Sequence, residues 1–189
     1  ELEKNSKGLK SGKDFFLGYS PERINPGDKV HTIDKINKVI SGQTKNVEKT
    51  MMAIYSKLTK GKVFLAKNIK VAEASKVIEN SQRDINIAFI NEITKICQKI
   101  DISIFDVLKA SSTKWNFLNF QPGLVGGHCI GVDPYYLSEK AKKLKIDPKV
   151  ILSGRKTNDK MGDFIGKIIK KKLKKNSKIL FLEVNFKED

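Results

Sequence analysis

The fold is decided by residues 69–100, which read IKVAEASKVIENSQRDINIAFINEITKICQKI. No proline or glycine interrupts this stretch, and its apolar side chains recur at the three- and four-residue spacing of an α-helix. They are Val71, Ala74, Val77, Ile78, Ile85, Ala88, Phe89, Ile93, Ile96, Cys97 and Ile100. The predicted helix is roughly 45 Å long at about 1.5 Å per residue. Helices of this length usually join domains or form the seam of an oligomer.

Short strands alternate with a helix in the sequence before residue 69. Residues 15–19, 38–41 and 62–66 are brief apolar runs typical of strands. Residues 46–58 have apolar side chains at helical spacing. The order strand, strand, helix, strand predicts the end of an α/β unit.

Shorter elements follow the long helix. Residues 102–111 predict a helix with Ser103 as its cap. A glycine-rich loop is predicted within residues 117–136, which read FLNFQPGLVGGHCIGVDPYY, and Asp133-Pro134 marks the start of a helix that ends near Lys142. Two more helices are predicted, from Pro148 to Asn158 and over residues 162–175. A strand is predicted over residues 177–184.

Composition limits the classes of function. The 189 residues contain 37 Lys+Arg against 21 Asp+Glu, a formal net charge of +16, yet only three are arginines. Proteins that read bases or grip phosphates favour arginine, so we regard nucleic-acid binding as disfavoured. The densest basic run, KIIKKKLKK at residues 167–175, fits a solvated helix face, an anion-binding surface or attachment to a membrane surface. No apolar stretch is long enough for a membrane span, and two cysteines rule out a disulfide scaffold.

The two cysteines lie in different contexts. Cys129 follows two glycines closely and precedes a predicted helix start, whose positive end favours a thiolate. We interpret it as either a reactive thiol or a small packed residue. Cys97 continues the apolar stripe of the long helix and is predicted to be core. Neither has histidines at the spacing of a zinc site, so no metal is expected.

Several polar residues have two readings each. Lys76, Asn80 and Arg83 share one helix face, either as members of ordinary helix ion pairs or with Lys76 held in a cleft as an acid, a base or an oxyanion partner. Asp133 is either a helix N-cap or a carboxylate close to a nucleophilic cysteine. Glu22, beside Pro21, is by default a solvated loop residue.

Four motifs in one order resemble the UDP-glucose/GDP-mannose dehydrogenase family. They are SPERINPGD at residues 20–28, KVIENSQRDINIA at 76–88, GLVGGHCIGVD at 123–133 and FKED at 186–189. The resemblance is closest to the branch that acts on UDP-N-acetylhexosamines. It covers nearly the whole chain, and the four motifs together are highly specific.

The resemblance implies an NAD-dependent enzyme that oxidises a sugar C6 alcohol twice to a uronic acid for surface polysaccharides. Cys129 matches the nucleophile, which forms a thiohemiacetal and then a thioester. Lys76 and Asn80 match the pair that stabilises the oxyanion and orders water, and Asp133 matches the carboxylate that assists. Glu22 matches a carboxylate near C6. The matched substrate contacts are Arg23, Ile24, Arg83, Gly126 and, for the nucleotide, Lys187. A cytoplasmic homodimer through the long helix is expected, with no membrane or nucleic-acid partner.

Two departures from the family pattern shape the expected architecture. Pro26 stands where relatives acting on UDP-glucose have a second glutamate, which argues against UDP-glucose. No G-x-G-x-x-G fingerprint occurs in the sequence. We therefore expect a mixed α/β fragment dominated by a central α-helical domain with a long helix, flanked by pieces of two Rossmann-like domains. The expected parts are the end of the NAD-binding domain (1–67), the central domain (68–175) and the first strand of a UDP-binding domain (176–189).

The fragment is expected to be inactive by itself. Two other functions stay open at this point. One is a non-catalytic helical dimerisation module, which the long helix favours. The other is a polyanion-binding basic protein, which the arginine-poor composition disfavours.

Overall fold

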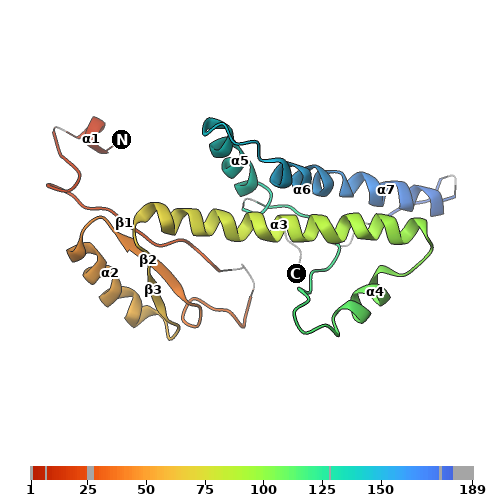
Figure 1. Cartoon of the computed structure of the whole chain (residues 1–189), viewed down its shortest axis with the longest axis horizontal. Helices are drawn as coiled ribbons and strands as arrows, with labels where there is room; N and C mark the ends of the chain where they lie inside the picture. Colours follow the sequence, from red (N-terminus) through yellow and green to blue (C-terminus); the bar gives the residue numbers. More distant parts are fainter. Residues whose placement is uncertain (1, 7, 25–27, 128, 175, 181–189) are drawn as a thin grey trace. The chain divides into compact units, whose positions relative to one another are not determined.

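The computed structural model describes residues 2–6, 8–24, 28–127, 129–174 and 176–180. The chain divides into two compact units, Glu1–Lys76 and Val77–Asp189, and the boundary falls inside the longest helix. Figure 1 labels the helices and strands of both units. The helices and strands of the described residues are α1 (Leu2–Asn5), β1 (Gly18–Tyr19), β2 (Lys38–Gly42), α2 (Lys45–Leu58), β3 (Val63–Leu65), α3 (Ile69–Lys99), α4 (Ile104–Ser111), α5 (Asp133–Lys143), α6 (Lys149–Asp159) and α7 (Met161–Lys172).

The first unit is a small sheet covered by one helix. The strand order is β1-β2-β3, with β1 antiparallel and β3 parallel to the central β2. Helix α2 makes the connection between the parallel strands and packs against β2. The turn into α2 needs glycine, because a Cβ at Gly42 would lie 2.7 Å from the backbone nitrogen of Glu48. Thr44 caps the helix by accepting a hydrogen bond from the Val47 amide at 3.4 Å.

The predicted strand at residues 15–19 is shorter in the structure, where only Gly18 and Tyr19 pair with β2. Residues 11–15 turn back on themselves, because the amide of Gly12 donates to the carbonyl of Phe15 at 2.8 Å. This local bond removes the start of the run from the sheet.

The second unit is built around α3. Helices α5, α6 and α7 run along one side of α3, and α4 lies on another side (Figure 1). Gly154 allows the close approach of α6, because a Cβ there would lie 3.3 Å from Cγ1 of Ile85. The apolar core consists of Ile90 and Cys97 of α3 with Ile104 and Leu108 of α4. The prediction that Cys97 is core is confirmed, since its relative exposure is 4%.

The apolar stripe of α3 is only partly buried. Phe89, Ile96 and Ile100 are about half exposed or more, at 59%, 49% and 60%. The buried face is offset from these residues and includes polar side chains. A large apolar surface along α3 is therefore left uncovered in the described chain.

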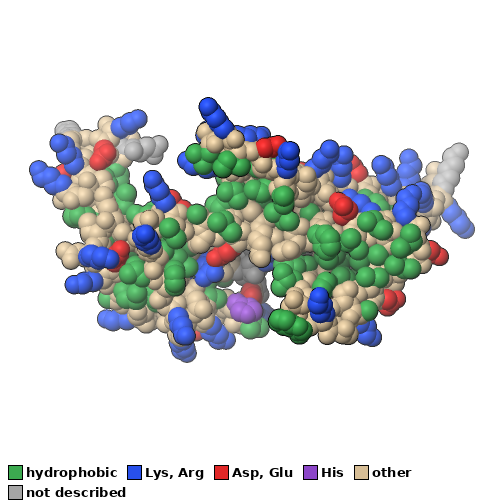
Figure 2. Space-filling model, in the orientation of Figure 1, with side chains coloured by type: hydrophobic (Ala, Val, Ile, Leu, Met, Phe, Trp, Pro, Cys, Tyr) green, Lys and Arg blue, Asp and Glu red, His purple; other side chains and the backbone are tan. Residues whose placement is uncertain are grey.

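The cap of α4, the basic helix and the C-terminal residues were also predicted from the sequence. Ser103 caps α4 as expected, accepting from the Asp106 amide at 3.3 Å. The basic helix begins at Met161 and ends at Lys172, and its lysines are exposed. On the face shown in Figure 2, basic side chains are scattered over both units and form no single patch. Residues 177–180 form no strand, and 181–184 lie outside the described residues. The predicted domain boundaries stay predictions.

Candidate active site

Three buried polar residues define one face of α3 in the second unit. Asn80, Asp84 and Asn91 are four and seven residues apart, so they lie on the same side of the helix. Their relative exposures are 9%, 0% and 0%. Asn80 forms a hydrogen bond with α5, Asp84 with α6, and Asn91 with both α6 and the glycine-rich loop. We call these three residues the polar face of α3.

Asn80 contacts Asp133, one of the residues predicted to take part in catalysis. Its side-chain amide donates to the Asp133 carboxylate at 2.6 Å, across 53 positions of sequence. The prediction that Asp133 caps α5 is wrong, because the N-cap is Val132, which makes no side-chain cap bond. Asp133 is instead the first residue of the helix, followed by Pro134, so its carboxylate is available to Asn80.

Cys129 lies in the turn just before α5. Its carbonyl accepts hydrogen bonds from the amides of Asp133 at 2.8 Å and Val132 at 3.1 Å, which fixes the backbone of the turn. Gly127, two residues earlier, has φ +80°, a left-handed conformation that favours glycine. Cys129 is exposed in the described chain, which favours the reactive thiol over the small packed residue, and its catalytic role stays a prediction. An accessible thiol four residues from a carboxylate is suited to nucleophilic chemistry.

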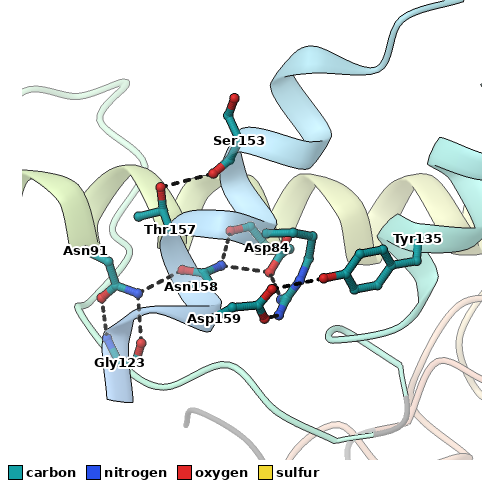
Figure 3. Close-up of polar contacts among 9 residues, drawn as sticks. Asp84, Asn91, Gly123, Tyr135, Ser153, Thr157, Asn158 and Asp159 are labelled. Atoms are coloured by element: carbon teal, nitrogen blue, oxygen red, sulfur yellow. Dashed lines mark hydrogen bonds and ion pairs between the residues drawn. The ribbon is translucent and has the colours of Figure 1, made fainter. Parts of the chain in front are cut away.

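The start of the glycine-rich loop contacts Asn91 (Figure 3). The side-chain amide of Asn91 donates to the Gly123 carbonyl at 2.8 Å, and its oxygen accepts from the Gly123 amide at 2.9 Å. The same amide also donates to Oδ1 of Asn158 at 2.9 Å. Asn158 in turn donates to the backbone and side-chain oxygens of Asp84, at 2.9 and 2.7 Å. These bonds connect the loop, α3 and α6.

A buried ion pair completes the network. Arg155 of α6 donates to Oδ1 of Asp84 at 2.5 Å and also pairs with Asp159. Asp159 accepts from the hydroxyl of Tyr135, on α5, at 2.9 Å. Burial raises the pKa of the Asp84 carboxyl, against the opposing effects of Asn158 and Arg155. Burial opposes the charge of Arg155, but the two carboxylates hold the pKa of the guanidinium above its usual value.

The other predicted residues of α3 and the loop are half-buried. They are Lys76, Arg83 and Gly126. Lys76 lies one turn before Asn80 on α3, as the sequence spacing predicts. Lys187 lies outside the described residues.

The first unit holds the remaining predicted residues. Glu22 is exposed, whereas Arg23 and Ile24 are half-buried. Arg23 donates to the carbonyl of Asn37 at 3.2 Å. Buried Lys38 of β2 donates to the Pro21 carbonyl at 3.0 Å, next to Glu22. Burial lowers the pKa of the Lys38 ammonium, and the charge of Glu22 partly opposes this effect.

Sequence reasoning missed Asn91, Arg155, Asn158 and Lys38. A weak signal was present for Asn91, because it lies four and three residues after Ile87 and Ala88 and so continues a helix face that begins with apolar side chains. A buried amide at such a position needs partners, and therefore marks a contact with specific backbone or side-chain groups. Lys38 gave no comparable signal, because a lysine at the start of a short strand is ordinarily solvated.

The described residues offer neither a metal site nor a membrane-spanning helix. They contain no group of three or more His, Cys, Asp or Glu side chains that could hold a metal ion. Within the same ranges, none of the helices combines the length and the apolar character that crossing a membrane requires.

Comparisons with known proteins cover nearly the whole chain. Residues 70–160 match the model of the UDP-glucose/GDP-mannose dehydrogenase family, central domain. The chain is 58% identical over 185 residues to "Protein CapL" of Staphylococcus aureus, covering 97% of this chain and 43% of that protein. It is 50% identical over 194 residues to a UDP-N-acetyl-D-glucosamine 6-dehydrogenase of Pseudomonas aeruginosa, covering 100% of this chain and 46% of that protein. The chain thus spans less than half the length of these relatives.

Solved structures agree with the sequence matches. The fold is similar to a UDP-D-ManNAc dehydrogenase of Pyrococcus horikoshii, with a TM-score of 0.79 and 29% identity over 90% of this chain and 40% of that one. It is also similar to the UDP-N-acetyl-mannosamine dehydrogenase Cap5O of S. aureus, with a TM-score of 0.71 and 34% identity over 87% of this chain and 39% of that one.

Proposed function

Because the chain belongs to the UDP-glucose/GDP-mannose dehydrogenase family, we propose that it supplies the catalytic cysteine and its supporting residues to an NAD-dependent UDP-N-acetylhexosamine 6-dehydrogenase. The enzyme would convert the C6 alcohol of the sugar to a carboxylate for surface polysaccharide synthesis. Relatives named for UDP-N-acetylglucosamine are 50% and 47% identical, whereas those named for UDP-N-acetylmannosamine are about 34% identical. UDP-N-acetylglucosamine is therefore the first substrate to test.

The observation that carries this proposal is the hydrogen bond between Asn80 and Asp133, four residues after an exposed Cys129. The thiolate of Cys129 adds to the C6 aldehyde, and the carbon–sulfur bond forms as the carbonyl oxygen becomes an oxyanion. Lys76 and Asn80 donate to that oxygen in the proposed arrangement, which lowers the energy of the tetrahedral species.

The second half of the reaction releases the product. Loss of a hydride (two electrons and one proton) from C6 of the thiohemiacetal oxyanion converts it to a thioester. Water then attacks the thioester carbon, the carbon–sulfur bond breaks, and the acid leaves with the Cys129 thiolate restored. Asp133 accepts the proton of the attacking water, because its carboxylate is held in place by Asn80. Glu22, Arg23, Ile24, Arg83, Gly126 and Lys187 are proposed contacts to the substrate.

NAD would accept the hydride in both oxidations. The 189 residues contain no G-x-G-x-x-G sequence that would hold its phosphates, so we assign none of them to NAD. Accordingly we propose that these residues alone form little or no NADH. Robust NADH production by the 189-residue chain would contradict that part of the proposal.

The experiment that tests the proposal is a chimera. The matched part of the P. aeruginosa UDP-N-acetyl-D-glucosamine 6-dehydrogenase is replaced by these 189 residues, and folding is checked by circular dichroism. NADH and uronate are then measured with UDP-GlcNAc, UDP-GalNAc, UDP-ManNAc and, as a control, UDP-glucose. We expect two NADH per uronate with at least one N-acetylhexosamine, and little with UDP-glucose. A folded chimera that oxidises none of the three UDP-N-acetyl sugars would refute the proposal.

A second candidate is a helical dimerisation module without catalysis. The observation in its favour is the exposed apolar surface of α3, which includes Ile78, Phe89 and Ile96. We propose that this surface pairs two copies of the chain, which is also compatible with the enzyme, and that the protein is cytoplasmic. Sedimentation of Phe89→Glu tests the pairing, with Trp115→Glu as the control at an exposed position outside α3. If the unchanged chain is a monomer, the module is excluded.

A further inference from the structure

The chain around Cys129 contacts α3 at two points. We call residues 123–127 and 129–133 the Cys129 segment. At its start Gly123 binds Asn91, and at its end Asp133 binds Asn80. The two asparagines are eleven positions apart on α3, roughly 16 Å along the helix axis. The chain from Gly123 to Asp133 extends to about 33 Å, so it has twice the length that the two contacts require. The bonds to the Cys129 carbonyl fix the turn from Cys129 to Asp133, and the two asparagine contacts fix where the two ends of the segment lie on α3.

Asn91 binds Gly123 through both functions of its amide. The two bonds resemble those between paired peptide groups, because the Asn91 side chain donates to the C=O of Gly123 and accepts from the N–H of the same residue. The orientation of the amide is fixed by its third bond, to Oδ1 of Asn158. Asn158 is itself oriented by two bonds to Asp84 (Figure 3). A single orientation of the Asn91 amide allows all the hydrogen bonds from Gly123 through Asn158 to Asp84.

Both asparagines are buried, Asn91 at 0% and Asn158 at 3% relative exposure. Two apolar side chains could fill the same space, but they would not select one peptide group of the loop. Directional bonds to Gly123 do select it, and they determine which residue of the loop lies against α3.

We propose that Asn91, oriented by Asn158, is a positioning residue that places the Cys129 thiol for the reaction. It contacts neither substrate nor thiol, and it acts by holding Gly123 against α3 while Asn80 holds Asp133. This inference rests on the proposed function for its catalytic consequence. The anchoring of the Cys129 segment does not depend on that function, so the two can fail separately.

The first test measures the anchoring in the 189-residue chain itself. Amide hydrogen exchange is recorded by NMR for the unchanged chain, for Asn91→Ala and for the control Asn86→Ala, an asparagine on the same helix. We expect exchange in the Cys129 segment to rise roughly tenfold in Asn91→Ala, with exchange in α4 unchanged, because only a local opening becomes easier. The control should show no change. Unaltered exchange in Asn91→Ala would overturn the proposal.

The second test measures catalysis in the chimera. We expect Asn91→Ala to lower kcat roughly 10²-fold, because a misplacement of about 1 Å has an effect of that size. The KM for the UDP-sugar should change far less than kcat, because Gly126 is one proposed substrate contact in the Cys129 segment whereas Arg23, Ile24 and Arg83 lie outside it. Faster exchange without a fall in kcat would overturn the positioning role. An inactive chimera combined with the expected exchange would refute the proposed function and leave the anchoring intact.

A third variant separates positioning from loss of folding. In Asn91→Asp one carboxylate oxygen still accepts from Gly123, but the other faces the carbonyl of Gly123 and Oδ1 of Asn158, which are both acceptors. Protonation restores a donor at that oxygen. The charged groups of the same network are Asp84 on α3 and Arg155 and Asp159 on α6.

The expected result is a new pH dependence. Relative to the unchanged chimera, Asn91→Asp should regain kcat as the pH falls from about 8 to about 5.5, because the buried carboxyl becomes protonated. Asn91→Ala should show the same pH dependence of kcat as the unchanged chimera, at lower kcat values throughout. If Asn91→Asp follows the alanine variant at every pH, the donor to Gly123 is not what places the thiol, and the proposal is wrong.

Discussion

The two halves of α3 differ in the side chains that they bury. The half from Asn80 to Asn91 also buries Ile87, Ala88 and Ile90, but its buried Asn80, Asp84 and Asn91 bind Asp133, the α6 network and Gly123. In the half around Cys97 the buried side chain is apolar, and together with Ile90 it packs against Ile104 and Leu108 of α4. The helix is continuous through both halves. One helix therefore packs into the apolar core at one end and positions the residues of the candidate active site at the other.

Each half has a different energetic consequence. Apolar burial stabilises in proportion to area and tolerates small shifts of the partner. Buried hydrogen bonds add little net stability, but they have a large penalty when one partner is lost, so they determine which groups meet. We therefore expect changes in the polar half to affect catalysis or to leave an unpaired charge. Changes in the apolar half should affect stability alone.

The largest effect is expected at the ion pair. Arg155→Met leaves Asp84 buried without its cationic partner, which should lower the free energy of unfolding by about 3–5 kcal/mol. Urea denaturation of the 189-residue chain, followed by circular dichroism, measures this loss. Lys156→Met, at the exposed neighbouring position, is the matched control. A loss for Arg155→Met no larger than that of the control would show that the pair does not stabilise the polar half.

Asn80→Ala should separate catalysis from stability. It removes the donor to Asp133 and the proposed oxyanion donor, so kcat of the chimera should fall roughly 10²–10³-fold. The free energy of unfolding should fall by only about 1 kcal/mol, the net value of one hydrogen bond. Asn86→Ala is again the control, in both assays. The distinction between the halves breaks down if kcat keeps its parental value.

Leu108→Ala probes the apolar half. It opens a cavity in the cluster with Ile90, Cys97 and Ile104, so the free energy of unfolding should fall by about 2–5 kcal/mol. Below its unfolding transition, the chimera should keep kcat within about twofold. Phe105→Ala, at an exposed position of the same helix, should change stability by under about 0.5 kcal/mol. A kcat loss as large as that of Asn80→Ala would mean that both halves position the site.

The smallest effect is a pH dependence from Asp84. Burial raises the pKa of its carboxyl in the folded chain, so the folded state keeps this proton at a pH where the unfolded state has lost it. The contribution of Asp84 to stability therefore falls as the pH rises from near 3.8, the usual pKa of an aspartate carboxyl, through the folded pKa. Asp84→Asn lacks this titration, and its stability relative to the unchanged chain should rise over the same window. Urea denaturation of both chains at several pH values measures this difference in the free energy of unfolding. The account is contradicted if the stability of Asp84→Asn relative to the unchanged chain falls as the pH rises.

Much of the fold could be predicted from local patterns. The predicted helix over residues 69–100 corresponds to α3 within a residue, because neither Pro nor Gly interrupts a strong helical period. The strand at 15–19 was overestimated, since its apolar run carries no information about the bond from Gly12 to Phe15. Of the two interpretations of Asp133, the sequence could not exclude the N-cap, because the local signal of Asp before Pro does not show the long-range partner Asn80.

The candidate site could be predicted only in part. The spacing of Lys76 and Asn80 and the glycines around Cys129 are local features, visible in the sequence. The role of Asn91 depends on Gly123 and Asn158, which are 32 and 67 positions away. Such pairings follow from tertiary packing, and helical periodicity marks the buried position without identifying its partners.

The central claim is that Cys129 is the nucleophile of the second oxidation. The most direct measurement is uronate formation by the chimera with and without Cys129→Ser, using the UDP-N-acetylhexosamine on which the unchanged chimera is most active. We predict that uronate formation falls by roughly 10⁴-fold, because a serine hydroxyl is a far poorer nucleophile than a thiolate and forms no thioester. Uronate formation by Cys129→Ser at the rate of the unchanged chimera would contradict the account.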